Sequence, residues 1–139
     1  MTAKEYLKQY EQMMILADMH KATYEETLET IDAVRSSANI DGMPHGNGIF
    51  KPVEDKAIRL SDAAMRWKMA VLDALEMKLK IYETICMIDG IERTVLVERY
   101  IRLRKWEEIC VLLGYSWHGV HSAHRRGLAK IQAILDKRA

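Results

Sequence analysis

The sequence predicts an all-α protein in which a long antiparallel helical hairpin is followed by a C-terminal three-helix domain. Good helix formers such as Met, Leu, Ala, Glu, Lys and Arg dominate the composition. Apolar residues recur with a helical period over two long segments, and β-branched residues do not alternate with polar ones over any long stretch. With 49% hydrophobic and 29% charged residues, the 139-residue chain has the composition of a folded protein.

The first long helix is expected to begin at Thr2, because Thr2-Ala3-Lys4-Glu5 has the form of a capping box. Beyond this box, residues of a packed face follow one another at alternating steps of four and three. They are Tyr6, Tyr10, Met13, Ala17, His20, Tyr24, Thr27, Ile31 and Val34. This heptad-like seam predicts one amphipathic helix, in which His20 and Thr27 are the weak points.

Residues 36–52 are expected to form a connection, because they contain turn formers and two prolines. The turn formers are Asp41-Gly42-Met43-Pro44 and Gly46-Asn47-Gly48. A segment this long between helices is either functional or mobile, and a flexible link between antiparallel helices is the simpler interpretation.

A second long helix is expected over residues 54–88, with two apolar stripes side by side. The first stripe contains Ala57, Leu60, Ala64, Trp67, Val71, Ala74, Ile81, Ile85 and Ile88. The second contains Ile58, Met65, Leu72, Leu75, Leu79 and Cys86. So wide an apolar arc needs two partners: the first helix for one stripe, and either a second copy or the C-terminal domain for the other. Residues 1–89 are therefore expected to form an oligomerisation hairpin, with a homodimer built as a four-helix bundle favoured.

A separate domain is expected over residues 90–139, where helices are predicted at about 91–103, 105–113 and 117–135. Gly114 stands where a left-handed residue ends the second of these helices, and Ser116 is a natural N-cap for the third. The short link between the second and third helices is the length expected of a helix-turn-helix.

The third of these helices is predicted to have a buried side and a cationic side. At 100° per residue, the apolar residues fall within roughly 80° of one another, and they are Val120, Ala123, Gly127, Ile131 and Ile134. Opposite them lie His118, His121, Ser122 and Arg125, with Arg126 toward one flank and Trp117 and His124 toward the other. Such groups match the acceptors of the DNA major groove and its phosphates. DNA recognition is the hypothesis, and an ordinary solvated face is the alternative.

The charge distribution also favours contact with a polyanion by the C-terminal part. Residues 1–90 contain 11 Lys and Arg against 15 Asp and Glu, whereas residues 91–139 contain 10 against 5. Arg102, Arg104 and Lys105 are candidates for phosphate contacts, although simple solvation would explain each of them. Because histidine gains charge as the pH falls from 7.5 to 6, the three histidines of the last helix predict tighter DNA binding on acidification.

Three segments of this domain resemble region 4 of sigma-70-type factors: Ile91–Tyr100, Trp106–Ile109 and Leu113–Ser116. The sequence is most similar to phage-encoded sigma-like regulators of the ArpU/RinA type, which also have an N-terminal helical part and a Gly-rich loop. The resemblance is specific over about residues 91–135 and touches most of the chain.

This resemblance implies promoter binding and activation of late genes in a phage or prophage. Carried over by position, the implied base readers are Trp117, His118, His121 and Ser122, with Arg125 and Arg126 further along. Sigma factors usually have Arg and Glu where Trp117, His118 and His121 stand here, which argues against a −35 hexamer as the target. No segment resembles sigma region 2, so an activator is favoured over an initiation factor.

Two other functions stay open at this level. The C-terminal domain could dock on RNA polymerase as a protein-interaction module, or the chain could be a phage small terminase-like component for DNA packaging. An enzyme is not expected, because the chain has no Gly-rich phosphate loop, no H-E-x-x-H and no G-x-S-x-G. No catalytic residue and no cofactor are therefore assigned.

A metal site is not expected either. The histidines of His118-x-x-His121-x-x-His124 diverge by about 120° and have no carboxylate or thiol nearby to complete a ligand set. Cys86 and Cys110 each lie within an apolar run, which predicts buried, reduced thiols in a cytoplasmic protein. The polar N-terminus is unlike a secretory signal, and no apolar run approaches the roughly 20 residues of a membrane span.

Overall fold

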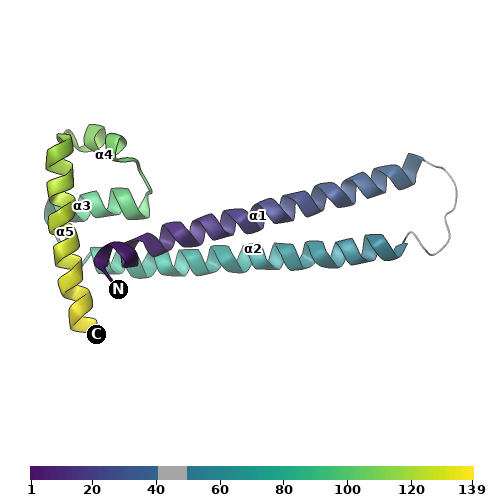
Figure 1. Ribbon diagram of the computed structural model, residues 1–139, viewed down its shortest axis with the longest axis horizontal. Helices are drawn as coiled ribbons and strands as arrows, with labels where there is room; N and C mark the ends of the chain where they lie inside the picture. The colour runs from purple at the N-terminus through teal and green to yellow at the C-terminus, as the bar shows by residue number, and fades with distance from the viewer. Residues whose placement is uncertain (41–49) are drawn as a thin grey trace. The chain divides into compact units, whose positions relative to one another are not determined.

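The computed structural model describes residues 1–40 and 50–139, with side chains described for 1–36 and 54–139. These residues form α1 (Ala3–Ile40), α2 (Phe50–Ile85), α3 (Gly90–Leu96), the π-helical turn η1 (Val97–Ile101), α4 (Trp106–Leu113) and α5 (Trp117–Arg138). The all-α prediction is confirmed: α1 and α2 form a long antiparallel hairpin, and the three helices that follow pack together (Figure 1). None of the described helices has the length and apolar character needed to cross a membrane.

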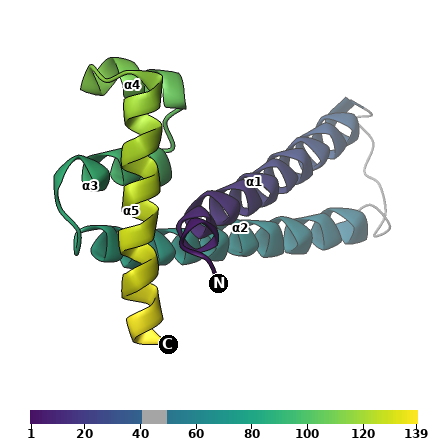
Figure 2. The same cartoon turned by 60° about the vertical axis from the view of Figure 1, so that its left-hand side comes forward.

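The chain divides into two compact units. The first comprises residues 1–13 and 73–139, and the second comprises residues 14–72. The first turns of α1 and the last turns of α2 therefore belong with α3, α4 and α5 (Figure 2).

Both signals that predicted α1 are confirmed. The backbone N–H of Thr2 donates to Glu5 Oε2 at 2.9 Å, and the N–H of Glu5 donates to Thr2 Oγ1 at 3.2 Å, which is the expected capping box. All nine residues of the predicted seam are buried or half-buried, His20 and Thr27 included. Leu7, which lies beside the seam, is fully buried as well.

The two long helices are separated by fewer residues than the sequence predicted. The connection was expected over residues 36–52, but α1 continues to Ile40 and α2 begins at Phe50. Pro52 lies in the first turn of α2, where a missing N–H removes no helical hydrogen bond. The predicted turns between Asp41 and Gly48 lie outside the described residues.

The two apolar stripes of α2 differ in burial. Residues of the first stripe are buried or half-buried, apart from Ala57. The second stripe is exposed throughout. In the unit of residues 1–13 and 73–139, Leu75, Leu79 and Cys86 are exposed, so the C-terminal helices leave this part of the stripe uncovered. Coverage by a second copy stays a prediction.

Within the first unit, polar contacts join the start of α1 and the end of α2 to α5. The backbone N–H of Ala3 donates to Gln132 Oε1 at 2.7 Å. Arg138 Nη1 donates to Thr84 Oγ1 at 3.0 Å, and the hydroxyls of Thr84 and Tyr6 are 3.1 Å apart. These contacts hold the C-terminal half of α5 against α1 and α2.

The predicted buried side of α5 is confirmed. Val120, Ala123, Gly127 and Ile131 are buried, and Ile134 is half-buried. A Cβ on Gly127 would lie 3.1 Å from Leu96 Cδ1, so the absent side chain allows α5 to pack closely on α3.

The turn between α4 and α5 also has the predicted chemistry. Gly114 ends α4 in the left-handed conformation at φ 68°, and Ser116 Oγ accepts from the backbone N–H of Gly119 at 3.1 Å. The buried core under this turn consists of Val95, Ile109, Val120 and Ala123, from α3, α4 and α5. This core fixes α4 and the turn against α5, and it takes its α5 residues from one side of that helix.

Candidate nucleic-acid interface

The N-terminal half of α5 presents the predicted reading residues to different extents. Trp117, His118, Arg125 and Arg126 are exposed, whereas His121 and Ser122 are half-buried. No Asp or Glu occurs in α5 before Asp136. This half of the helix therefore has an exposed surface whose ionisable groups are all basic.

Arg125 is the most available cation of this surface. Its Nη2 donates to Ser122 Oγ at 3.2 Å, one turn earlier on the helix. Guanidinium has five N–H donors, so most of them stay free for an acceptor outside the protein. The contact with Ser122 restrains the long side chain, which lowers the entropy lost when Arg125 binds a ligand.

Arg126 is held by an ion pair. Its Nε donates to Glu92 Oε1 of α3 at 2.9 Å, and Lys130 Nζ is 3.8 Å from the same oxygen. The hydrogen bond from Arg126 is the main reason that the pKa of the Glu92 carboxyl is lowered. Arg126 thus serves first to join α5 to α3, and its charge is partly compensated.

His121 lies between two tryptophan rings. Its ring centroid is 4.4 Å from that of Trp106 and 4.4 Å from that of Trp117. Its Nε2 is buried and has no hydrogen-bond partner among the described residues. His121 therefore packs α4 against the first turn of α5, and it leaves Trp117 and His118 as the exposed side chains of that turn.

His124 was expected on the flank of the reading surface, and this prediction is wrong. The residue is 7% exposed, and a hydrogen bond of 2.7 Å joins its Nε2 to the Tyr100 hydroxyl. Burial lowers the pKa of His124 to about 4 and raises the pKa of Tyr100 to about 12, so both are neutral at pH 7. His124 therefore does not contribute to the pH dependence of DNA binding that was expected from the three histidines of α5.

The buried His124 predicts a loss of stability in acid. Its pKa is lower in the folded state than in the unfolded chain, so its contribution is complete above about pH 6.5 and declines as the pH falls toward 4. We expect the free energy of unfolding to fall by about 2 kcal/mol between pH 7 and pH 5 from this group. Urea denaturation across this range measures the loss.

The matched variant is His124→Gln, which retains an acceptor for Tyr100 but does not titrate. Carboxyl groups titrate equally in both proteins, so the difference between their pH profiles isolates His124. Parallel profiles for the two proteins would contradict the assignment.

Of the three cations predicted to contact phosphates before α4, Arg102 and Arg104 form ion pairs with the buried carboxylate of Glu98. Glu98 is 6% exposed, with Arg104 Nε 2.6 Å from its Oε2 and Arg102 Nη1 3.3 Å from its Oε1. Arg99 Nη1 donates to the Arg104 carbonyl at 2.9 Å. These contacts hold the loop that contains Leu103, whose φ of 55° is unfavourable for a residue with a side chain. Lys105 is exposed at the N-cap of α4.

Trp106 is a structural residue of this region that the sequence analysis missed. Its ring is 4.6 Å from the Arg99 guanidinium and 4.8 Å from the His124 ring, in addition to the contact with His121. A tryptophan beside a predicted turn was the available signal. Its partners come from η1 and α5, so helical periodicity within any one segment could not reveal them.

Two further predictions concern a metal site and the two cysteines. Among the described residues, no three His, Cys, Asp or Glu side chains gather in a way that could hold a metal ion. Cys110 is half-buried and Cys86 is exposed, both as free thiols, so the prediction that Cys86 is buried is wrong. Comparisons with protein-family models, with curated proteins and with solved structures find no match to the chain.

Proposed function

We propose that this protein is a DNA-binding transcriptional regulator in which α4 and α5 act as a helix-turn-helix. One observation supports this more than any other: the N-terminal half of α5 exposes Trp117, His118 and Arg125 on a helix without a carboxylate before Asp136. An exposed helix that only faced water would usually mix acidic with basic residues.

The packing of α5 suits entry into a major groove. Its aliphatic side rests on α3 and α4, and its capped first turn begins directly after the turn at Gly114–Ser116. The major groove of B-DNA admits an α-helix, and the N-terminal residues of a recognition helix reach the base edges. In this arrangement α5 reads bases and α4 supports it.

The side chains then divide into two roles. Arg125 donates to guanine O6 and N7, while His118 and Ser122 donate to or accept from neighbouring base edges. Lys105 contacts a phosphate. Arg104 and Arg126 contact phosphates through the N–H groups that do not bond to Glu98 and Glu92. His121 positions Trp117 and itself makes a smaller contribution to reading.

The biological role proposed is late-gene activation in a phage or prophage. It follows from the resemblance of residues 91–135 to sigma region 4 and to ArpU/RinA-type regulators. Direct contact with RNA polymerase is compatible with this role, because such activators act at promoters.

A homodimer is the second part of this proposal. The exposed stripe of α2 contains Ile58, Met65 and Leu72 in the unit of residues 14–72, and each is close to half exposed or more. Apolar side chains in a row along a helix are stabilised when a second helix covers them. Analytical ultracentrifugation at micromolar concentration is expected to give twice the 16.1 kDa of the chain, and a single-chain mass would contradict the dimer.

Salt titration tests the electrostatic part of DNA binding. Random duplex fragments are selected on the wild-type protein, and the affinity of a selected fragment is measured by fluorescence anisotropy. If about four cations contact phosphates, the affinity is expected to fall about a hundredfold between 50 and 200 mM salt. An affinity that does not change with salt would contradict the proposed interface.

A further inference from the structure

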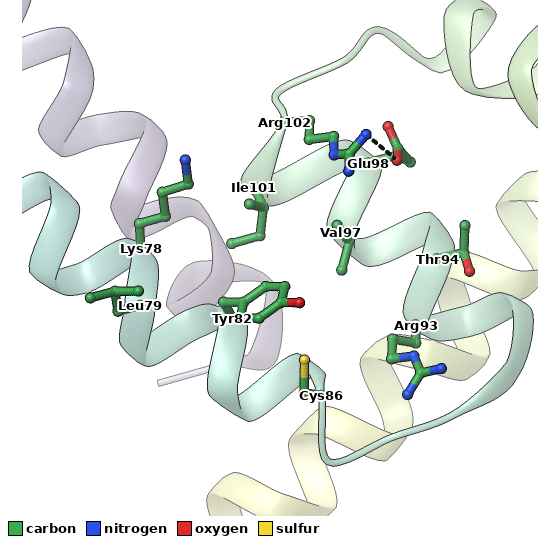
Figure 3. Close-up of a pocket in the computed structure, with 10 residues that line it drawn as sticks. All are labelled: Lys78, Leu79, Tyr82, Cys86, Arg93, Thr94, Val97, Glu98, Ile101 and Arg102. Atoms are coloured by element: carbon green, nitrogen blue, oxygen red, sulfur yellow. Dashed lines mark ion pairs between the residues drawn. The ribbon is translucent and has the colours of Figure 1, made fainter.

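A groove lies between the end of α2 and the α3–η1 segment (Figure 3). Its volume is about 560 Å³, within the usual range of ligand and peptide sites. Three lining residues come from α2 and a fourth directly follows it, while the others come from α3, η1 and the residue after η1. They are Lys78, Leu79, Tyr82, Cys86, Arg93, Thr94, Val97, Glu98, Ile101 and Arg102.

The groove combines an apolar surface with a basic rim. Leu79 and Tyr82, which line the groove with Val97 and Ile101, are 62% and 46% exposed. The Tyr82 side chain extends toward Val97 and Ile101 (Figure 3). The charged lining residues are three cations and Glu98. Because Arg104 and Arg102 already pair with Glu98, its carboxylate does not offset the rest of the rim. Arg93 has no ion-pair partner among the described residues and is exposed.

A patch on α4 combines an apolar surface with acidic side chains, whereas the rim of the groove is basic. Val111 is 84% exposed and Leu112 is 53% exposed, although both are aliphatic. Glu107 and Glu108 precede them by three to five residues, so the four side chains lie on one surface of the helix. Both glutamates are exposed, and neither has an ion-pair partner among the described residues. Arg104 also lines this patch, but its guanidinium is paired with Glu98. The α4 patch is therefore apolar at its centre and acidic at one end.

We propose that the α4 patch of one copy of this protein docks in the groove of a second copy. The aliphatic pair would cover Leu79 and Tyr82, and the glutamates would meet Arg93. Patch and groove share no lining residue, and both are open within the single chain. A contact between two different surfaces is heterologous, so it can join further copies in a row. This contact uses Leu79 and Cys86 from one end of the second stripe, but none of Ile58, Met65 and Leu72, through which the hairpin dimer is proposed. It does not require DNA.

Disulfide trapping tests the contact in the full-length protein. Cys86 lines the groove and is exposed, so Val111→Cys provides a partner thiol without disturbing a buried residue. A disulfide requires Cα atoms about 4.4–6.8 Å apart. Under a mild oxidant we expect a covalent dimer whose linked peptides contain Cys86 of one chain and the new Cys of the other. Ala129→Cys, an exposed position on α5, is the matched control and should give several-fold less.

Charge reversal provides a second test of the contact between the α4 patch and the groove. Arg93→Glu in the Val111→Cys chain should reduce trapping several-fold, and adding Glu108→Arg should restore it. The proposal is overturned if trapping does not exceed that of Ala129→Cys, if Arg93→Glu leaves it unchanged, or if the linked peptides join two Cys86 residues. Circular dichroism of each variant verifies that it is folded, and a failure here leaves DNA binding by α5 unaffected.

Discussion

Replacing Arg125 with alanine is expected to weaken binding to a selected DNA fragment by about ten- to a hundredfold. A well-placed bidentate contact between Arg and guanine contributes about 1–3 kcal/mol of discrimination. Arg125 is exposed, restrained by Ser122 and free of ion-pair partners among the described residues. The dissociation constant at one fixed salt concentration, measured by fluorescence anisotropy, gives the effect.

Lys137→Ala provides the control, because it removes the same charge from the same helix. Lys137 lies twelve residues beyond Arg125, about 18 Å along the helix axis. It should weaken binding only slightly, through the general field of the protein. Equal losses for the two variants would show that α5 attracts DNA by charge alone and does not read it with Arg125.

The same variant separates the competing functions. If the C-terminal domain acts only by docking on RNA polymerase, Arg125→Ala should leave regulation in cells intact. If α5 reads an operator, regulation and DNA binding should decline together. Ring-shaped oligomers in electron micrographs would instead favour a DNA-packaging component.

Local signals predicted the framework of the site well. The capping box at Thr2, the left-handed Gly114 and the N-cap at Ser116 are determined by residues within one turn of each other, and all three are confirmed. The buried side of α5 was also predictable, because its angular positions depend only on helix geometry.

The neighbours of the cationic residues could not be predicted in this way. Helical angles placed Arg126 and His124 on the flanks of the reading surface, but gave no information about Glu92 or Tyr100 on other helices. Those partners divert Arg126 into an ion pair and bury His124. The π-helical turn at Val97–Ile101 likewise departs from the 3.6-residue period on which the prediction depended.

These partners narrow the candidate interface. Of the eight predicted DNA-binding residues, Arg104 and Arg126 form ion pairs and His121 is stacked between aromatic rings. Ser122 is half-buried. Trp117, His118, Arg125 and Lys105 stay exposed. A reading surface of this size suits a protein that gains affinity from more than one copy, which agrees with the self-association proposed for both the hairpin and the α4 patch.

Ile109→Ala is expected to lower the free energy of unfolding by about 2–5 kcal/mol, the usual range for truncating a buried Ile. Ile109 is fully buried between Val95, Val120 and Ala123, and it is the buried residue of α4. Without it, a helix of eight residues retains mainly the partly buried Trp106, Cys110 and Leu113 as apolar contacts. Urea denaturation measures the loss.

Leu112→Ala is the matched control, since it makes a similar truncation three residues later at a position that is 53% exposed. We expect it to change stability by no more than about 0.5 kcal/mol. Hydrogen exchange adds a local measurement: Ile109→Ala should accelerate exchange of the α4 amides more than those of α3, because Ile109 is the fully buried side chain of α4 and the other apolar contacts of this helix are only partly buried. DNA binding should weaken with it, since α5 loses the contacts of its first turns with α4. If the two substitutions destabilised the protein equally, α4 would not be held by the core beneath the turn, and the rigid helix pair required for base reading would be absent.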